Sequence, residues 1–574
     1  MFKLLKYMKK HKWIALTAPF FKLLECTFEL MVPLVMKNII DKGIPSSDIN
    51  SVIHSCFILF LLAIVGFSCT VMAQYFAARS SAMFVRDVKH ATFDHIQSLS
   101  YSQLDKLTTS SLITRMTSDM NQVQTGTNLT LRLLLRSPFI VFGAVVMAFI
   151  VNKDQASIFV VAVPILFAIV ITIMVACLPL YRKVQSQLDV ILRKTRENLT
   201  GVRVIRAFNL EEQEKEKYDD ETDVLNRLQQ HVGRISNLMN PLTYVVVNVS
   251  IVALLYTGAI KVNSGLLSKG EIIALYNYMS QILVELIKLT SLVITITKSI
   301  ASGNRIQEIL ETEPSIISGN TDLSECDIAV EFDNVSLSYH SGAEEALHDV
   351  SFTVRKGSTV GLIGSTGSGK SSVINLIPRY YDCSEGTVRI NGSDSRSLNT
   401  DSLRRSIGTV PQKAVLFKGT VRSNLLWGNE EASDEELIEA LKLAQAYDFI
   451  AGKDGLNTVV EQGGSNFSGG QRQRLTIARA LVRKPQILIL DDSTSALDYA
   501  TEAKLRSVLK NLPYECTTFI VSQRTGSIKH ADLILVMDDG DLVGKGTHQQ
   551  LLKECEVYQE IYYSQYQKEE TAYA

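Results

Sequence analysis

The sequence predicts a membrane protein of two parts, an all-α domain with six membrane-spanning helices followed by a soluble α/β domain. Long apolar runs are confined to the first half of the 574 residues, and the whole chain is 46% hydrophobic but only 20% charged. In the second half, the apolar segment Ile487–Leu490 runs directly into Asp491 and Asp492. Such a segment is typical of a buried parallel strand, whose carboxyl end is where α/β sheets bind ligands.

Six segments are long and apolar enough for membrane spans, which need roughly 20 mainly apolar residues each. They lie near residues 13–40, 52–77, 133–152, 156–180, 238–260 and 271–298. Two polar, helix-favouring stretches separate them, near 79–131 and 181–237. We expect the spans to continue through these stretches as long helical extensions, with reversals near Ser111–Asn121 and Asn198–Phe208. An ordinary amphipathic connecting helix is the alternative at each reversal.

The distribution of basic residues predicts the orientation in the membrane. Lysines and arginines are frequent in both polar stretches and at the N-terminus, whereas the loops near 41–51 and 153–155 carry few. By the positive-inside rule, both stretches and both termini are expected in the cytoplasm. The basic segment Met1–Trp13 has no small-residue cleavage site after a short apolar core, so we expect an interfacial helix instead of a removable signal. A bacterial plasma membrane fits this pattern.

Composition argues against nucleic-acid binding and against a zinc site. The formal net charge of −1 provides no basic field for nucleic acid. The eight cysteines are scattered without a CxxC pair, which indicates reduced, structural thiols and no zinc site.

Charged residues inside the predicted spans suggest a functional cavity. Glu25 and Glu29 lie four residues apart on one helical face, with Lys22 one turn earlier, and Glu285 and Lys288 share a face of the sixth span. Placing an ionisable group in a membrane costs free energy unless the group is paired or hydrated. One interpretation is a wet cavity in which Glu25 and Glu29 attract cationic amphiphiles. The alternative is that Lys22 and Lys288 neutralise them, or that they lie near the outer interface.

The junction Glu311–Val330 is polar and contains Pro, Gly, Asn and Ser, as expected of a linker. We therefore predict a membrane domain at 1–320, a linker at 321–330 and a soluble domain at 331–574.

The soluble half contains a phosphate-binding loop. Gly364–Ser371 reads GSTGSGKS between a predicted strand and a predicted helix, which matches G-x-x-x-x-G-K-[ST]. Backbone N–H groups of such a loop wrap the phosphates of ATP, the lysine reaches the β and γ phosphates, and the serine ligates Mg²⁺. Asp491 is then the carboxylate on the metal side. The loop residues are Gly364, Ser365, Thr366, Gly367, Ser368, Gly369, Lys370 and Ser371.

A second glycine motif precedes the acidic strand. Phe467–Gln471 reads FSGGQ and opens a predicted helix, where Ser468, Gly469, Gly470 and Gln471 offer amides and a hydroxyl at a positive helix end. A plain glycine-rich cap is the alternative.

These motifs, in this order after six spans, resemble the ABC exporter family, whose chains join a transmembrane domain to an ATP-binding cassette. The resemblance covers nearly the whole chain. It implies that Tyr339 stacks on adenine, that Gln412 senses Mg²⁺ and the γ-phosphate, and that Ser468–Gln471 and Ser495–Asp498 act across a head-to-tail dimer. It also identifies the two reversals with coupling helices.

Three positions depart from the family pattern. The catalytic glutamate that should follow Asp491 is Asp492, which is shorter by one methylene, and the switch histidine is Gln523, which cannot carry charge or relay a proton. A GERG-like run before the signature is replaced by Glu461–Gly464, which is expected to alter coupling to the partner's helices. The two losses at one chemical centre predict a site that binds ATP but hydrolyses it poorly.

We therefore expect one subunit of an ATP-driven efflux transporter for drug-like or lipid-like amphiphiles. Its FSGGQ motif would complete the hydrolysing site of a second, non-identical half-transporter. A homodimeric exporter with slow turnover and an ATP-binding regulatory membrane module that does not pump are the alternatives.

Overall fold

The computed structural model describes residues 1–46, 48–339 and 344–566 and divides into two compact units. The helical unit comprises Met1–Gln97 and Thr108–Thr312, and the α/β unit comprises Ser98–Leu107 and the chain from Glu313 onward. The predicted fold class, a helical membrane part followed by an α/β part, is confirmed.

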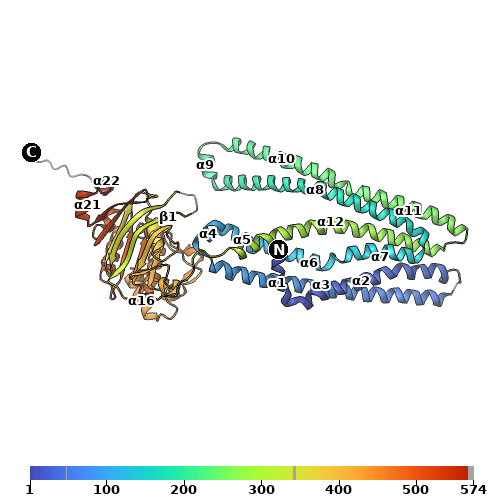
Figure 1. Ribbon diagram of the computed structural model, residues 1–574, viewed down its shortest axis with the longest axis horizontal. Helices are drawn as coiled ribbons and strands as arrows, with labels where there is room; N and C mark the ends of the chain where they lie inside the picture. The colour runs from blue at the N-terminus through green and yellow to red at the C-terminus, as the bar shows by residue number, and fades with distance from the viewer. Residues whose placement is uncertain (47, 340–343, 567–574) are drawn as a thin grey trace, which may run out of the picture. The chain divides into compact units, whose positions relative to one another are not determined.

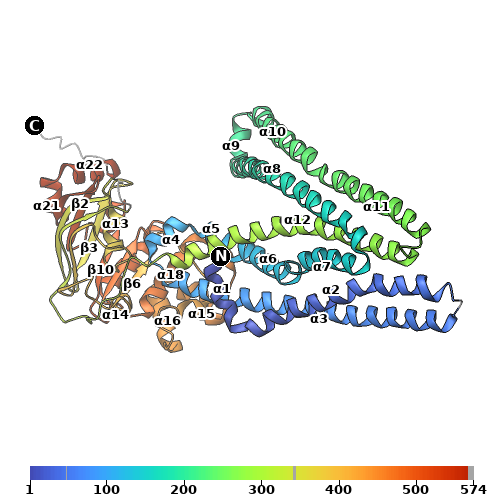
Figure 2. The same ribbon diagram turned by 45° about the vertical axis from the view of Figure 1, so that its right-hand side comes forward.

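The helical unit consists of long helices that lie side by side (Figures 1 and 2). Its helices are α1 (Leu5–Met8), α2 (Lys12–Asn38), α3 (Ile49–Ser98), α5 (Thr109–Thr114), α6 (Met120–Leu133), α7 (Arg136–Val151), α8 (Lys153–Thr200), α9 (Val202–Ala207), α10 (Glu211–Asn237), α11 (Met239–Asn263) and α12 (Lys269–Glu311).

Among the described residues, five helical runs are long and apolar enough to cross a membrane, and they contain the last five predicted spans. The remaining expected span corresponds to α2, which carries Lys22, Glu25 and Glu29 in its middle. The five runs are Ile49–Ser98, Thr109–Val151, Lys153–Thr200, Glu211–Asn263 and Lys269–Glu311.

The N-terminal segment, expected as an interfacial helix, is helical: α1 lies between the 3₁₀ turns Phe2–Leu4 and Lys9–His11, and the segment packs on the helical unit. Leu4 is only 1% exposed and lies in a cluster with Phe84, Val88 and Ile306. All eight cysteines are free, as expected of reduced thiols.

The first predicted reversal is wrong, because Ser111–Asn121 is helical. The chain instead turns around α4 (Tyr101–Leu107) and Thr108, whose φ is +55°. The hydroxyls of this polar run find partners inside the helix, with Thr114 donating to the Ser110 carbonyl and Thr117 to the Ile113 carbonyl, so the run does not need to leave the helix to satisfy them. The second reversal is where it was predicted, at α9 between α8 and α10.

The α/β unit contains two main sheets and the helices that cover them. Its strands are β1 (Ile328–Leu337), β2 (Leu347–Arg355), β3 (Thr359–Gly364), β4 (Glu385–Ile390), β5 (Ser393–Asp394), β6 (Ile407–Val410), β7 (Gly419–Thr420), β8 (Val459–Val460), β9 (Ile487–Asp491), β10 (Thr517–Val521), β11 (Leu533–Asp538) and β12 (Asp541–Gly546). Besides α4, its helices are α13 (Lys370–Leu376), α14 (Thr400–Ser406), α15 (Val421–Leu425), α16 (Asp434–Leu443), α17 (Tyr447–Ala451), α18 (Gly469–Val482), α19 (Tyr499–Lys510), α20 (Thr525–Ile528), α21 (His548–Glu554) and α22 (Glu556–Gln565).

The larger sheet places the motifs at one edge. Its strand order is β12-β11-β3-β10-β9-β6, and all neighbouring strands are parallel except β12. The carboxyl ends of β3, β9, β10 and β6 therefore meet on one side, where they lead to the glycine loop, Asp491, Gln523 and Gln412. The smaller sheet is antiparallel in the order β2-β1-β4-β5.

Two buried apolar clusters hold this arrangement. Val360 and Leu362 of β3 point into one cluster and Ile363 into the other, so the central strand is covered on both faces. Because the central strands of the larger sheet are buried on both faces, they appear in the sequence as continuous apolar runs.

Candidate nucleotide site

The glycine-rich loop forms a turn between β3 and α13. Gly369 precedes the helix with a φ of +92°, a left-handed conformation that glycine adopts without steric cost. A Cβ on Gly364 would lie 2.0 Å from the Met537 carbonyl oxygen, so only glycine fits there. Ser365, Thr366 and Gly367 are exposed at the tip of the loop. The loop can therefore present backbone N–H groups to an anion beside a helix N-terminus.

Lys370 is folded back over this loop. Its Nζ donates to the Gly364 carbonyl at 3.0 Å and to the Ser368 hydroxyl at 3.1 Å, and the residue is 9% exposed. Burial lowers the pKa of Lys370, and the nearby carboxylates Asp491 and Asp492 oppose that shift. Ser371 is exposed in the first turn of α13. The ammonium and the hydroxyl are thus held at the mouth of the loop.

The two acids at the end of β9 have different surroundings. Burial, followed by repulsion from Asp492, raises the pKa of Asp491. Asp492 has a φ of +44°, and its Oδ2 accepts a hydrogen bond of 3.4 Å from the Gln412 amide nitrogen. Asp491 is therefore the more shielded carboxylate, whereas Asp492 faces the residue that follows β6.

The donor set around Asp491 suits magnesium. No group of three or more His, Cys, Asp or Glu side chains in the described part of the chain is placed to hold a metal ion by itself. Magnesium at phosphate sites uses one or two protein ligands together with phosphate oxygens and water. Ser371, Gln412 and Asp491 supply hydroxyl, amide and carboxylate oxygens of this kind, so the residues fit Mg²⁺ bound with a nucleotide.

Gln523 follows β10 at the same sheet edge, where its side chain is exposed. Its backbone carbonyl accepts a 2.6 Å hydrogen bond from Gln565 Nε2. The structure thus brings Gln523 to the edge that holds the phosphate loop and the two acids.

Tyr339, expected to stack on adenine, lies beside the phosphate-loop helix. Its hydroxyl is 2.9 Å from the Ser372 hydroxyl, and its ring meets Tyr381 edge to face at 5.0 Å. The tyrosine is half-buried, with an aromatic face that can stack on a base.

The FSGGQ motif forms a capping box at the start of α18. The Ser468 hydroxyl accepts from the Gln471 N–H at 3.3 Å, and the Gln471 side chain accepts from the Ser468 N–H at 3.0 Å. Gly469 is exposed, and a Cβ on Gly470 would lie 3.0 Å from the Ala496 carbonyl oxygen. The signature therefore lies against the segment Ser495–Asp498, so both motifs expected at a dimer interface are neighbours in this chain.

The preceding run Glu461–Gly464 forms a short 3₁₀ turn. Gly463 and Gly464 both have a φ of +68°, and the Glu461 carboxylate accepts from the Ser465 hydroxyl at 2.9 Å.

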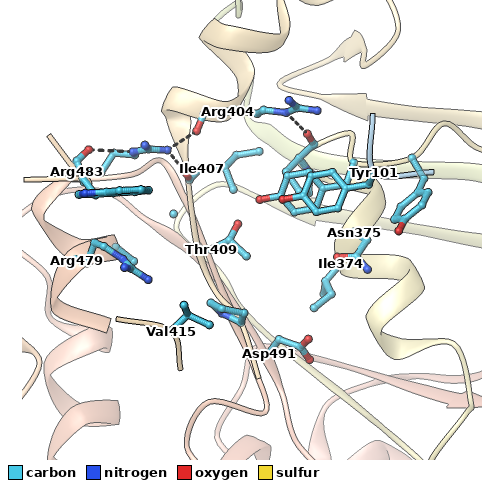
Figure 3. Close-up of a pocket in the computed structure, with 18 of the residues that line it drawn as sticks. Tyr101, Ile374, Asn375, Arg404, Ile407, Thr409, Val415, Arg479, Arg483 and Asp491 are labelled. Atoms are coloured by element: carbon cyan, nitrogen blue, oxygen red, sulfur yellow. Dashed lines mark hydrogen bonds between the residues drawn. The ribbon is translucent and has the colours of Figure 1, made fainter. Parts of the chain in front are cut away.

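A cleft of about 640 Å³ opens between α4 and the sheet edge (Figure 3). Asp491 lies at one end of the cleft, and Arg483 borders it by donating to the backbone carbonyls of Arg404 and Ile407. Tyr101 of α4 stacks on Tyr380 at 4.5 Å, and Tyr381 donates to the Asp105 carboxylate. Sequence reasoning missed α4, because nothing in YSQLDKL distinguishes it from the helices around it.

Tyr381 connects Tyr339 with α4. Burial, with a further contribution from Asp105, raises the pKa of Tyr381, so its phenol remains a donor at neutral pH.

Tyr381→Phe keeps the ring and removes the hydrogen bond to Asp105. Amide exchange in α4 should therefore increase by about fivefold, the equivalent of ~1 kcal/mol for one hydrogen bond. Hydrogen exchange with mass spectrometry measures this change. Lys106→Gln, at an exposed position on the same helix, is the matched control, and equal exchange in both variants would remove Tyr381 from this role.

In the helical unit, the predicted pair Glu25 and Glu29 belongs to a buried ionic network. Lys22 Nζ donates to Glu25 at 2.6 Å, as the neutralising alternative expected. Arg136 Nη2 donates to Glu29 at 2.9 Å, and its Nη1 pairs with Glu285. Arg136 is the partner that sequence reasoning missed, because it lies 107 residues from Glu29.

Comparison with known proteins agrees with this architecture. A family model described as the ABC transporter transmembrane region matches residues 15–286, and the ABC transporter model matches residues 347–495. The chain is 37% identical over 568 residues to the Bacillus subtilis ABC transporter ATP-binding protein YfiB, covering 99% of both chains. It is 30% identical to a Rickettsia conorii export ATP-binding/permease protein, covering 98% of each.

A solved structure of a bacterial Atm1-family ABC exporter with ATP bound superimposes with a TM-score of 0.82 at 25% identity, covering 97% of this chain and 99% of that one. The expected family resemblance is therefore confirmed. The chain belongs to the ABC transporter family, as a membrane-embedded, ATP-hydrolysing exporter in which one transmembrane region is fused to one nucleotide-binding domain.

Proposed function

We propose that the chain is one subunit of a heterodimeric exporter whose own phosphate loop forms a slowly hydrolysing ATP site. The observation that carries this proposal is the contrast at one sheet edge. Lys370, Ser371 and Asp491 retain the groups that hold a nucleotide, whereas the position for a base carries the shorter Asp492. ABC exporters act as dimers, and we propose that the second subunit here is a non-identical half-transporter.

Binding of ATP uses groups that are already in place. The γ-phosphate would draw Lys370 Nζ away from the Gly364 carbonyl, because a charge-assisted bond to phosphate is stronger than one to a neutral carbonyl. Tyr339 would stack on adenine, and Ser371, Gln412 and Asp491 would hold Mg²⁺. When bound, the metal neutralises phosphate charge.

Hydrolysis needs a base within hydrogen-bond reach of the attacking water. Asp492 is shorter than glutamate by one carbon–carbon bond, about 1.5 Å. Misplacement by about 1 Å can lower a rate on the order of 100-fold. Gln523 can donate to the γ-phosphate but cannot be cationic. ATP would thus remain bound at this site for a long time, because its hydrolysis there is slow.

The intact FSGGQ motif supports a partner with a competent site. In a head-to-tail dimer each signature completes the other chain's site, so Ser468–Gln471 would serve ATP held by the partner. ATP binding would close the cassettes and turn the cavity outward, and hydrolysis at the partner's site would reset it. By the positive-inside rule, both termini, α4 and α9 would lie on the cytoplasmic side, and the cargo would be a drug-like or lipid-like amphiphile.

Co-expression with a partner that carries glutamate after its metal aspartate tests the heterodimer. Ser468→Ala removes a hydroxyl that would face the partner's γ-phosphate, and loss of one such donor costs about 100-fold or more in turnover. We expect Ser468→Ala to lower ATPase activity of the complex far more than Asp492→Asn does. Measuring initial rates of phosphate release decides this.

Ser468→Thr is the control, because it keeps the hydroxyl and the cap of α18, and melting curves check that both variants fold. Full-rate hydrolysis by this chain alone would favour the homodimer instead. ATP binding without vesicle uptake of any amphiphile in the complex would favour the regulatory module.

A further inference from the structure

Helix α12 carries a polar face in a segment apolar enough to span a membrane. Asn277, Ser280, Gln281 and Lys288 lie at spacings of three, four and seven residues, which places them on one side of the helix. The opposite side, with Leu275 and Met279, is fully buried. Polar residues in a membrane helix mark a protein-lined or water-filled path. This face is therefore a candidate for contact with cargo.

The face lines a cavity of about 360 Å³ between α12 and α2. Glu29 and Pro33 contribute from α2. From α12 the cavity is lined by Asn277, Ser280, Gln281, Glu285 and Lys288, and Glu285 is the carboxylate that pairs with Lys288. All of these residues belong to the helical unit. Glu25, one turn before Glu29, does not line the cavity.

Residues of both helices that line the cavity carry hydrogen-bond acceptors. Among the described side chains, Gln281 Oε1 is one of few buried atoms without a hydrogen-bond partner. Pro33 has no N–H to donate to the carbonyl of Glu29, four residues earlier in the helix. The Glu29 side chain is itself 37% exposed. A ligand group with several N–H donors would satisfy these acceptors.

The charges of the network set the net charge of that ligand. Lys22, Arg136 and Lys288 balance Glu25, Glu29 and Glu285, so the cluster has no surplus negative charge. A cation alone would therefore add an uncompensated charge. Lys288, which is 43% exposed and 3.0 Å from Glu285, provides a positive group in the same cavity as Glu29. Opposite charges thus line one cavity.

We propose that this cavity binds a zwitterionic group, with a primary ammonium at Glu29 and Gln281 and an anionic group at Lys288. The inference rests on the proposed export function and narrows its substrate class. It replaces a purely cationic amphiphile as the preferred cargo, because Arg136 already neutralises Glu29. A lipid headgroup and a free amino acid with an alkyl chain share this chemistry.

Binding is measured by calorimetry on the full transporter in phosphatidylcholine nanodiscs without nucleotide, after subtraction of partitioning into empty nanodiscs. The probes are 2-aminodecanoic acid, decylamine, decanoic acid and dihexanoylphosphatidylethanolamine. We expect at least one of the two zwitterions to bind tenfold or more tightly than the amine and the acid. Tighter binding of the phosphatidylethanolamine assigns the site to a lipid headgroup, and tighter binding of the amino acid assigns it to a free zwitterion.

Variants locate the site. Glu29→Gln should weaken zwitterion binding about tenfold and Gln281→Leu about fivefold, whereas Glu25→Gln, the matched control on the same helix, should change it less than twofold. Melting curves confirm folding. Equal affinity for all four probes, or equal effects of Glu25→Gln and Glu29→Gln, overturns the proposal. Because no ATP is present, selective binding without ATP-driven transport would overturn only the proposed export function.

Discussion

Replacing Asp492 with glutamate is expected to raise ATP hydrolysis at this chain's own site by about 100-fold. The added methylene extends the carboxylate by about 1.5 Å, which is the reach that a base in this position lacks. Asp491, Lys370 and Ser371 are unchanged, so ATP affinity should stay within about threefold. The measurement is phosphate release by the complex in which the partner's catalytic glutamate is replaced by glutamine, so that only this site is counted.

Two further variants separate reach from other causes. Asp492→Asn removes the charge without adding length and should show no gain. Gln523→His alone should give little, because the base would still be short, whereas adding it to Asp492→Glu should increase the rate further. If Asp492→Glu leaves the rate unchanged and Asp492→Asn lowers it strongly, Asp492 is a working base and the slow-site proposal is wrong.

The backbone at position 492 slightly disfavours glutamate. Asp492 has a φ of +44°, a region where aspartate is found more often than glutamate. The exchange therefore carries a small conformational penalty, of about 1 kcal/mol. A melting temperature close to that of the natural chain would show that the penalty is absorbed, and that any change in rate reflects chemistry.

The sheet edge at which the predicted nucleotide residues meet could be anticipated from sequence, and the reason is local. The phosphate loop, FSGGQ and the acidic strand each depend on neighbouring residues, and a parallel sheet brings strand ends to one edge whatever the length of chain between them. The positions of Lys370, Asp491 and Gln412 follow from that rule.

What sequence reasoning missed depends on contacts between distant residues. The first reversal was placed too late because Ser and Thr in a helix can bond to the preceding turn and leave no sign of a break. Arg136 was overlooked because it opens an otherwise apolar helix, and only folding brings it to Glu29 and Glu285. The partners expected for the acids were therefore correct for Lys22 and incomplete for Glu29.

Loss of Arg136, the partner that was missed, is expected to have the largest effect on stability. Arg136 is 8% exposed and Glu285 is 3% exposed, so Arg136→Met would leave a buried carboxylate without its guanidinium. Removing one member of a buried pair costs about 3–5 kcal/mol of unfolding free energy. Chemical denaturation of the purified chain in detergent, followed by loss of helical circular dichroism, measures the change.

The double variant Arg136→Met with Glu285→Met distinguishes an uncompensated charge from lost packing. Replacing both partners by apolar side chains of similar volume is often neutral, because no ion is then left out of water. Glu29 and Lys288 are 37% and 43% exposed, so water can solvate the charges that lose a neighbour. We therefore expect the double variant to recover most of the loss and to unfold within about 1.5 kcal/mol of the natural chain, a strongly non-additive result. If the double variant is as unstable as Arg136→Met, Arg136 stabilises the helices by packing and the network is not held together by charge.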